Sequence, residues 1–390
     1  MTETEVANLT QELIRRIDKK VRPNVLGGPT LILCDLYVYS MSSISEVDMD
    51  YQLTIHFRLR WEDRRLAYTE PVSSLVIPPS DISDFWIPDV YFTNEKGSNQ
   101  HIVIIPNKGI RLLPNGTVCF STRLTLTLSC DMDLSNFPHD LQSCGMKIST
   151  YFHRTEDVLL QWLDDTPVEL PPGLLSLPQF ELVDIRHGYC NESYKSGDYP
   201  CLEATFDMRR EFGFYALQTY IPSVLIVSLS WLSFWIDKDA VPGRVTLGVT
   251  TVLTMTTQLS SSKSSNVKVS YPKAVDYWYS MCMLLVYGAL VEFVLVNFVS
   301  TREKRLQRQL LAETDDATIE EQLCCEVVVD VPASKRQNSK HRTSIRRPVP
   351  TQTSSRYRCT ANSIDRASRI IFPGTFLLFN VIYWNQFLNT

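Results

Sequence analysis

A run of hydroxyl side chains in the second half of the chain has the spacing of one helix face. Between Arg244 and Lys263 lie 18 uncharged residues, and nine of them are serine or threonine. Spacings of four and three place residues on one face, here Thr246, Thr250, Leu253, Thr257, Ser260 and Ser264. Such a stripe can hydrogen-bond neighbouring helices, or it can line a water-filled pore with Leu253 as an apolar constriction. We favour the pore, and several copies must then surround one axis.

Three other runs are apolar enough to cross a bilayer as helices. They span residues 212–236, 277–300 and 370–390, and Glu292 is the single charge within them. About 20 apolar residues cross the hydrocarbon core. Together with the hydroxyl run, they predict a four-helix transmembrane bundle. Residues 301–369 carry 14 Lys and Arg against 9 Asp and Glu, and this excess places the segment in the cytoplasm.

The first 211 residues follow the period of strands. From Tyr51 to Trp61 every odd position is apolar, which is typical of a half-buried strand and places Arg58 on its solvent face. Turn clusters such as Pro78–Asp81 separate short strands of this kind. Short strands with frequent turns favour a β-sandwich, preceded here by one amphipathic helix over Ala7–Lys19.

Cysteines and sequons suggest that this part is extracellular. Sequons begin at Asn8, Asn115 and Asn191, which are the expected glycosylation sites. Disulfides persist in oxidising compartments, and two pairs of cysteines here are close in sequence, namely Cys130 with Cys144 and Cys190 with Cys201. Cys34 and Cys119 are either free thiols or a third bridge, and their positions do not decide between these.

Several segments resemble the pentameric Cys-loop ligand-gated ion channels. Thirteen residues separate Cys130 from Cys144, around a centre of Phe137-Pro138-His139-Asp140. Residues 239–258, 220–236 and 364–373 are similar to the pore helix and to the first and last helices of the anion-selective branch, which includes glycine receptors and glutamate-gated chloride channels. The resemblance implies that both short cysteine pairs are disulfides and that five subunits, identical or mixed, surround the pore.

We therefore expect a multidomain fold, with an extracellular β-sandwich (with its N-terminal helix) and a four-helix transmembrane bundle. The sandwich takes residues 1–211 and the first three membrane helices take 212–300. A largely disordered cytoplasmic loop follows over 301–363, and the fourth helix takes 364–390.

The resemblance also assigns the pore its selectivity. Cation-selective relatives place Glu just before the basic residue at the cytoplasmic mouth, where this chain has Gly243 before Arg244. A ring of Arg244 with no acidic ring beside it attracts anions. The expected pore residues are Pro242, Gly243, Arg244, Thr246, Thr250, Leu253 and Thr257, and chloride is the expected ion.

The agonist site implied by the resemblance lies between adjacent sandwiches. One subunit supplies an aromatic box, whose ring faces attract an ammonium group, from Tyr91, Tyr151, Tyr194 and Tyr199. Thr150 and Ser196 of the same subunit are further expected ligand-binding residues. The neighbouring subunit supplies Arg58, Ser121 and Arg123, and Arg58 can clamp a carboxylate. This combination suits an amino acid. A channel gated by histamine, GABA or protons, an orphan heteromeric subunit, and a transmitter-binding protein without conduction remain the alternatives.

A coupling region is expected where the sandwich meets the membrane helices. Phe137, Pro138 and Asp140 should lie near Lys268 and Tyr271, and Arg210 should pair at the surface with Asp140 or with Glu46 or Asp48. No motif of an enzyme, a metal site or a nucleic-acid-binding protein is found, and no cofactor is expected. The predicted partners are a small-molecule agonist, chloride and membrane lipid, in a multi-pass plasma-membrane protein with an extracellular N-terminus.

Overall fold

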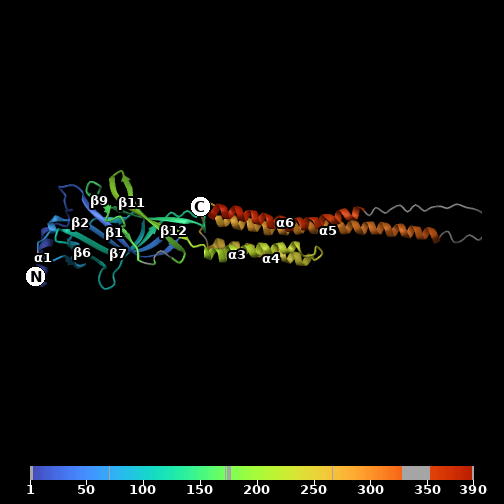
Figure 1. The fold of residues 1–390 in the computed structure, drawn as a ribbon, viewed down its shortest axis with the longest axis horizontal. Helices are drawn as coiled ribbons and strands as arrows, with labels where there is room; N and C mark the ends of the chain where they lie inside the picture. The colour runs from blue at the N-terminus through green and yellow to red at the C-terminus, as the bar shows by residue number, and fades with distance from the viewer. Residues whose placement is uncertain are drawn as a thin grey trace, which may run out of the picture. The chain divides into compact units, whose positions relative to one another are not determined.

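The computed structural model describes residues 3–69, 71–171, 173, 177–265, 267–326 and 352–388. The chain divides into two compact units (Figure 1). The first comprises Met1–Gly213 with Val267–Lys273, and the second comprises Phe214–Asn266 with Ala274–Thr390. Each unit is described by itself.

The first unit contains a sheet of eight strands after the helix α1 (Glu3–Arg16). Its order is β10-β1-β2-β7-β6-β3, with β5 paired to β7 and β9 paired to β1. The strands are β1 (Thr30–Ser45), β2 (Asp50–Glu62), β3 (Leu75–Ile77), β5 (Glu95–Gln100), β6 (Lys108–Leu112), β7 (Thr117–Ser129), β9 (Val158–Trp162) and β10 (Val168–Glu169). Short 3-10 turns, η1 (Arg64–Leu66) and η2 (Ile82–Asp84), join some of them.

The second sheet has four strands in the order β11-β12-β8-β4. They are β4 (Val90–Phe92), β8 (Leu141–Thr150), β11 (Phe180–Tyr194) and β12 (Gly197–Arg210). The two sheets pack face to face, because Phe57 of β2 lies 5.4 Å from Phe92 of β4 and Tyr51 lies 6.4 Å from Phe206, ring centre to ring centre. The odd positions of β2 are buried throughout the strand. The predicted alternation and the sandwich are confirmed, and each large side chain buried this way contributes about 1.5–3 kcal/mol.

The second unit consists of helices. They are α2 (Gly213–Tyr215), the π-helical turn η3 (Ala216–Tyr220), α3 (Ile221–Trp231), the 3-10 turn η4 (Leu232–Phe234), α4 (Val241–Ser265), α5 (Ala274–Glu326) and α6 (Gln352–Leu388). Three stretches of the described residues are long and apolar enough to cross a membrane: Gly213–Phe234, Ala274–Gln309 and Asn362–Phe387. The hydroxyl-rich α4 is a helix of 25 residues but is not among them, because its composition is too polar.

The expected disorder of residues 301–363 is wrong at both ends of that segment. Helix α5 continues to Glu326, and α6 begins at Gln352. Residues 301–326 and 352–363 contain neither glycine nor proline, the two residues that most disfavour a helix. The charged residues of these segments do not by themselves end a helix. The remainder of the predicted loop, 327–351, lies outside the described residues.

Candidate functional site

Two of the expected aromatic residues are brought together by neighbouring strands. Tyr91 lies on β4 and Tyr151 directly follows β8, and these strands pair so that Tyr91 is opposite Ser149. The two rings meet edge to face with their centres 5.7 Å apart. Tyr151 is 75% exposed, so its ring face is open to a ligand.

The hairpin of β11 and β12 adds two more tyrosines and a carboxylate. The rings of Tyr194 and Tyr199 lie 5.8 Å apart, and Ser196 Oγ is 3.1 Å from the Tyr199 hydroxyl. Tyr194 donates a hydrogen bond of 2.6 Å to Glu192. That bond and the charge of Glu192 raise the pKa of Tyr194 to about 12.

Glu192 was not among the residues predicted from the sequence. Burial, together with the charge of Glu192, raises the pKa of Tyr91, so this carboxylate acts on both halves of the aromatic cluster. We define the aromatic cluster as Tyr91, Tyr151, Glu192, Tyr194 and Tyr199. A carboxylate beside aromatic faces is suited to an ammonium group. The signal in the sequence was an acidic residue two positions after Cys190, inside the short cysteine loop.

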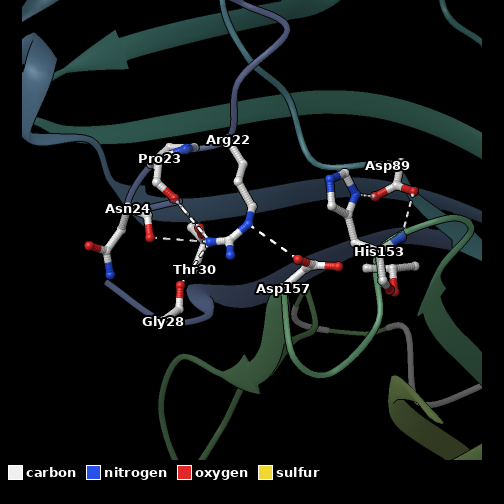
Figure 2. Close-up of polar contacts among 9 residues, drawn as sticks. Arg22, Pro23, Asn24, Gly28, Thr30, Asp89, His153 and Asp157 are labelled. Carbon is white, nitrogen blue, oxygen red and sulfur yellow. Dashed lines mark hydrogen bonds and ion pairs between the residues drawn. The ribbon is translucent and has the colours of Figure 1, made fainter. Parts of the chain in front are cut away.

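The loop that carries Tyr151 is held at both ends (Figure 2). Asp89 accepts hydrogen bonds from the Phe152 amide (2.6 Å) and lies 2.5 Å from His153 Nδ1. Further along the loop, Asp157 lies 3.5 Å from Arg22 Nε. These contacts position Tyr151 without using its ring, so Asp89 supports the cluster although the sequence analysis did not name it.

Thr150 does not reach the open surface. It is buried, and its hydroxyl donates to the backbone oxygen of His153 at 2.5 Å. Thr150 is the last residue of β8, and the turn after it needs this internal hydrogen bond. Its hydroxyl therefore holds the turn that carries Tyr151, and a contact of Thr150 with a ligand stays a prediction.

The expected basic residues lie on the eight-stranded sheet. Arg58 of β2 is directly opposite Ser121 of β7, and His56 is opposite Arg123. The guanidinium of Arg123 lies over the ring of Tyr39, 4.6 Å from its centre. Arg58, Ser121 and Arg123 are therefore close together, as predicted, and we call them the basic face. They belong to a different sheet from the aromatic cluster.

Arg58 is not a free cation. Its Nη2 lies 2.5 Å from Asp35 Oδ2 and 2.8 Å from Glu169 Oε1. Asp35 is the residue of β1 directly opposite Arg58, and Glu169 ends β10. Alternation along β2 predicted the face on which Arg58 lies, but it contained no information on these neighbouring strands.

Burial and nearby charges shift the pKa values of Asp35 and His56, which lie next to the basic face. Burial raises the pKa of Asp35, and the nearby Arg58 offsets part of that rise. Burial, with the charge of Arg58, lowers the pKa of His56. His56 is therefore less protonated at neutral pH than an ordinary histidine.

Both predicted disulfides are present. Cys130 is bonded to Cys144 and Cys190 to Cys201, with Cα atoms 5.2 and 4.9 Å apart. Among the described residues Cys34, Cys119 and Cys282 are free, which answers the open question about the first two. Asn8 and Asn115 of the sequons are exposed, and the side chain of Asn191 lies outside the described residues.

The expected coupling residues form a buried ion-pair network in the first unit. Arg210 Nε donates to Asp140 at 2.8 Å, and Arg210 also pairs with Glu46. The Arg210 and Asp140 side chains are buried, so the expectation of a weak surface pair is wrong. The Arg210 guanidinium lies over the ring of Phe137, 4.7 Å from its centre, because this loop closes around it.

The other members of this region are only partly assembled. The Leu134 amide donates to the Tyr271 hydroxyl at 2.9 Å, which brings the predicted linker residue to the disulfide loop. Phe137 and Pro138, at the centre of that loop, are buried. Lys268 is exposed, and no contact of Lys268 with the loop is observed among the described residues.

The hydroxyl stripe of α4 lies on an exposed helix face. Thr246, Thr250, Leu253 and Thr257 are all exposed, as are Pro242 and Gly243. The threonine hydroxyls donate to carbonyls of their own helix, for example Thr250 to Thr246 O at 2.7 Å. Their bonding is satisfied within α4, so the alternative of hydroxyl bonds to a neighbouring helix is not observed for these three threonines.

Arg244 does not share that face. Its side chain is 1% exposed and lies 2.9 Å from Asp365 Oδ2 of α6, and its Nε donates to Ile236 O at 3.0 Å. A helix turns about 100° per residue, so Arg244 lies about 200° from Thr246. It belongs to the buried face with Gly248 and Met255. The predicted ring of free Arg244 charges along the pore is therefore wrong.

Comparison with protein families accounts for both units. Residues 6–212 match the model of the neurotransmitter-gated ion-channel ligand binding domain. Residues 219–352 match that of the neurotransmitter-gated ion-channel transmembrane region. The first match alone covers more than half of the chain, and proteins of this family are pentameric ligand-gated channels rather than enzymes. The chain therefore belongs to the neurotransmitter-gated ion-channel family.

Proposed function

We propose that the chain is a subunit of an anion-selective channel that an amino-acid agonist opens by binding between neighbouring subunits. The observation that carries the selectivity is the exposed face of α4. From Pro242 to Thr257 it presents hydroxyl, apolar and backbone groups, and it contains no carboxylate. A ring of carboxylates is the usual feature of a cation-selective pore.

The surroundings of the cytoplasmic end of α4 support an anion. Asp239 precedes the helix and is paired with Lys304 at 2.7 Å, and Arg244 is paired with Asp365. The unbonded amides at a helix N-terminus carry about half a positive charge. Because the side-chain charges are paired, we attribute the attraction of anions to the cytoplasmic end of the pore mainly to the N-termini of the α4 helices.

Leu253 is the proposed constriction. It is the large apolar residue among the exposed hydroxyls and is 62% exposed. A ring of leucines in a narrow pore excludes water and so blocks ions. Thr246, Thr250 and Thr257 then line the wetted parts of the same path.

The two faces of the extracellular sandwich complement a zwitterion. The aromatic cluster, with Glu192, suits an ammonium group, and the basic face, with Arg58, suits a carboxylate. They lie on different sheets, and a small agonist would contact the aromatic cluster of one subunit and the basic face of its neighbour. We propose that Ser121 and Ser196 supply further hydrogen bonds to the agonist.

An amine without a carboxylate is the second candidate agonist. It is favoured by one observation, namely that Arg58 already contacts both Asp35 and Glu169. An amine such as histamine would use the aromatic cluster alone. The same proposal of a plasma-membrane pentamer, with identical or mixed subunits, holds for either agonist.

Expression of the full chain in a cell with few endogenous channels tests the agonist class. Glycine, L-glutamate and GABA would be applied while current is recorded, and histamine and tyramine would serve as amines. The proposal predicts current with at least one carboxylate-bearing compound. Current with amines alone would move the assignment to the second candidate.

A further inference from the structure

Arg58 is held by two carboxylates that differ in how easily they can leave. Both contact the same nitrogen, Nη2, while Arg58 Nε is buried without a hydrogen-bond partner. A guanidinium offers five N–H donors in a planar fork. The arrangement therefore leaves part of the fork unused, although the charge of Arg58 is already balanced.

Asp35 is the fixed partner. Its side chain is 6% exposed, and it lies within β1 directly opposite Arg58. Separating a buried charge from its counter-charge is strongly unfavourable. Asp35 therefore stays with Arg58 whether or not a ligand is present.

Glu169 is the exchangeable partner. Its side chain is 54% exposed, twice the 27% of Arg58, and it ends the two-residue strand β10. Exposed ion pairs contribute only about 0–1 kcal/mol. Water can replace Arg58 around the Glu169 carboxylate at small cost.

We infer that Glu169 occupies Arg58 in the resting channel and that the carboxylate of the agonist displaces it. This inference rests on the proposed amino-acid agonist. Asp35 and Glu169 both contact Nη2 of Arg58, so an agonist carboxylate that bonds to this nitrogen must replace one of them. Glu169 is the more exposed of the two, so Glu169 is the partner that leaves, and it sets the sensitivity to agonists that carry a carboxylate.

The test compares E169Q with E62Q in the full-length channel. Glu62 is a matched control, because its side chain is 57% exposed and pairs with Arg64, outside the basic face. E169Q should lower the half-maximal concentration of the activating amino acid roughly two- to fivefold, as expected for loss of an exposed pair. E62Q should leave it unchanged, and neither variant should alter any response to an amine.

The outcomes separate this inference from the proposed agonist class. If R58A greatly weakens the amino-acid response while E169Q matches wild type or is less sensitive, displacement is wrong and the agonist class stands. An equal gain with E62Q would reduce the effect to general surface charge and would also overturn displacement. If no carboxylate-bearing compound opens the wild-type channel, the agonist class fails and displacement fails with it.

Discussion

Arg58 of β2 and Arg244 of α4 were both expected to be open cations, and both are paired. They differ in their surroundings. Arg58 is 27% exposed and one of its partners is exposed too. Arg244 is 1% exposed, and its partner Asp365 is 8% exposed. This difference in burial supports our proposal that Arg58 can exchange a carboxylate for a mobile anion. Arg244, by contrast, stabilises the packing of α4 against α6.

Arg244 then has a structural task in the second unit. Its guanidinium joins α4 to Asp365 of α6 and to the carbonyl of Ile236, just after η4. Gly248 continues the same buried face, and a Cβ there would come within 2.7 Å of Leu290 of α5. Packing of the buried face of α4 therefore fixes the direction in which its exposed hydroxyl face points.

The largest expected effect is on folding, from D365N. It removes the carboxylate that is paired with the buried Arg244, and breaking a buried pair costs about 3–5 kcal/mol. Surface pentamers, measured by surface labelling and by size-exclusion chromatography of a fluorescent fusion, should fall to a small fraction of wild type.

The control for D365N is D239N, which breaks the exposed pair with Lys304. Exposed pairs contribute about 0–1 kcal/mol, so D239N should assemble normally. Normal surface pentamers from D365N would mean that the Arg244 pair is dispensable and that the contrast with Arg58 is wrong.

The next effect is on agonist response, from R58A. Truncating a charged partner of a bound carboxylate typically costs 2–5 kcal/mol, so the half-maximal agonist concentration should rise about tens- to thousands-fold. R58K should recover part of the response, because a lysine keeps the charge but lacks the fork. Concentration–response curves measure both.

R60A is the matched control for R58A. Arg60 lies two residues further along β2, on the same sheet face, and is opposite Cys119. Its removal should change agonist sensitivity far less than R58A does. Equal losses in both variants would indicate a general electrostatic effect rather than a bound carboxylate.

The smallest effect on folding is expected from L253S, because Leu253 lies on the exposed face of α4. The variant should assemble normally. A hydroxyl there should wet the constriction and raise the resting current or the agonist sensitivity. Met255, buried on the opposite face, provides the contrast, and M255S should reduce assembly instead. Unchanged current and sensitivity in L253S would place the constriction elsewhere.

Periodicity predicted faces better than it predicted partners. The alternation of β2 and the hydroxyl spacing of α4 gave the correct exposed faces, because both depend on local geometry. Periodicity could not predict that Asp35 pairs with Arg58 or that Asp365 pairs with Arg244, because each pair joins residues of different strands or helices. The face of Arg244 was predictable, because a residue two positions before Thr246 cannot share its side of a helix.

The aromatic cluster shows the same division. Its four tyrosines were expected from the family resemblance and are found together in two edge-to-face pairs. Glu192 and Asp89 were missed, because a single acidic residue has no periodic signal. Their roles became visible only through the hydrogen bonds to Tyr194 and His153.

The most direct test of the central claim is the reversal potential of the agonist-gated current. Whole-cell recordings would replace external chloride with a large impermeant anion and, separately, external sodium with a large cation. An anion-selective pore predicts that the reversal potential follows the chloride gradient and ignores sodium. A reversal potential that follows sodium would contradict the account, because the uncharged exposed face of α4 would then not exclude cations.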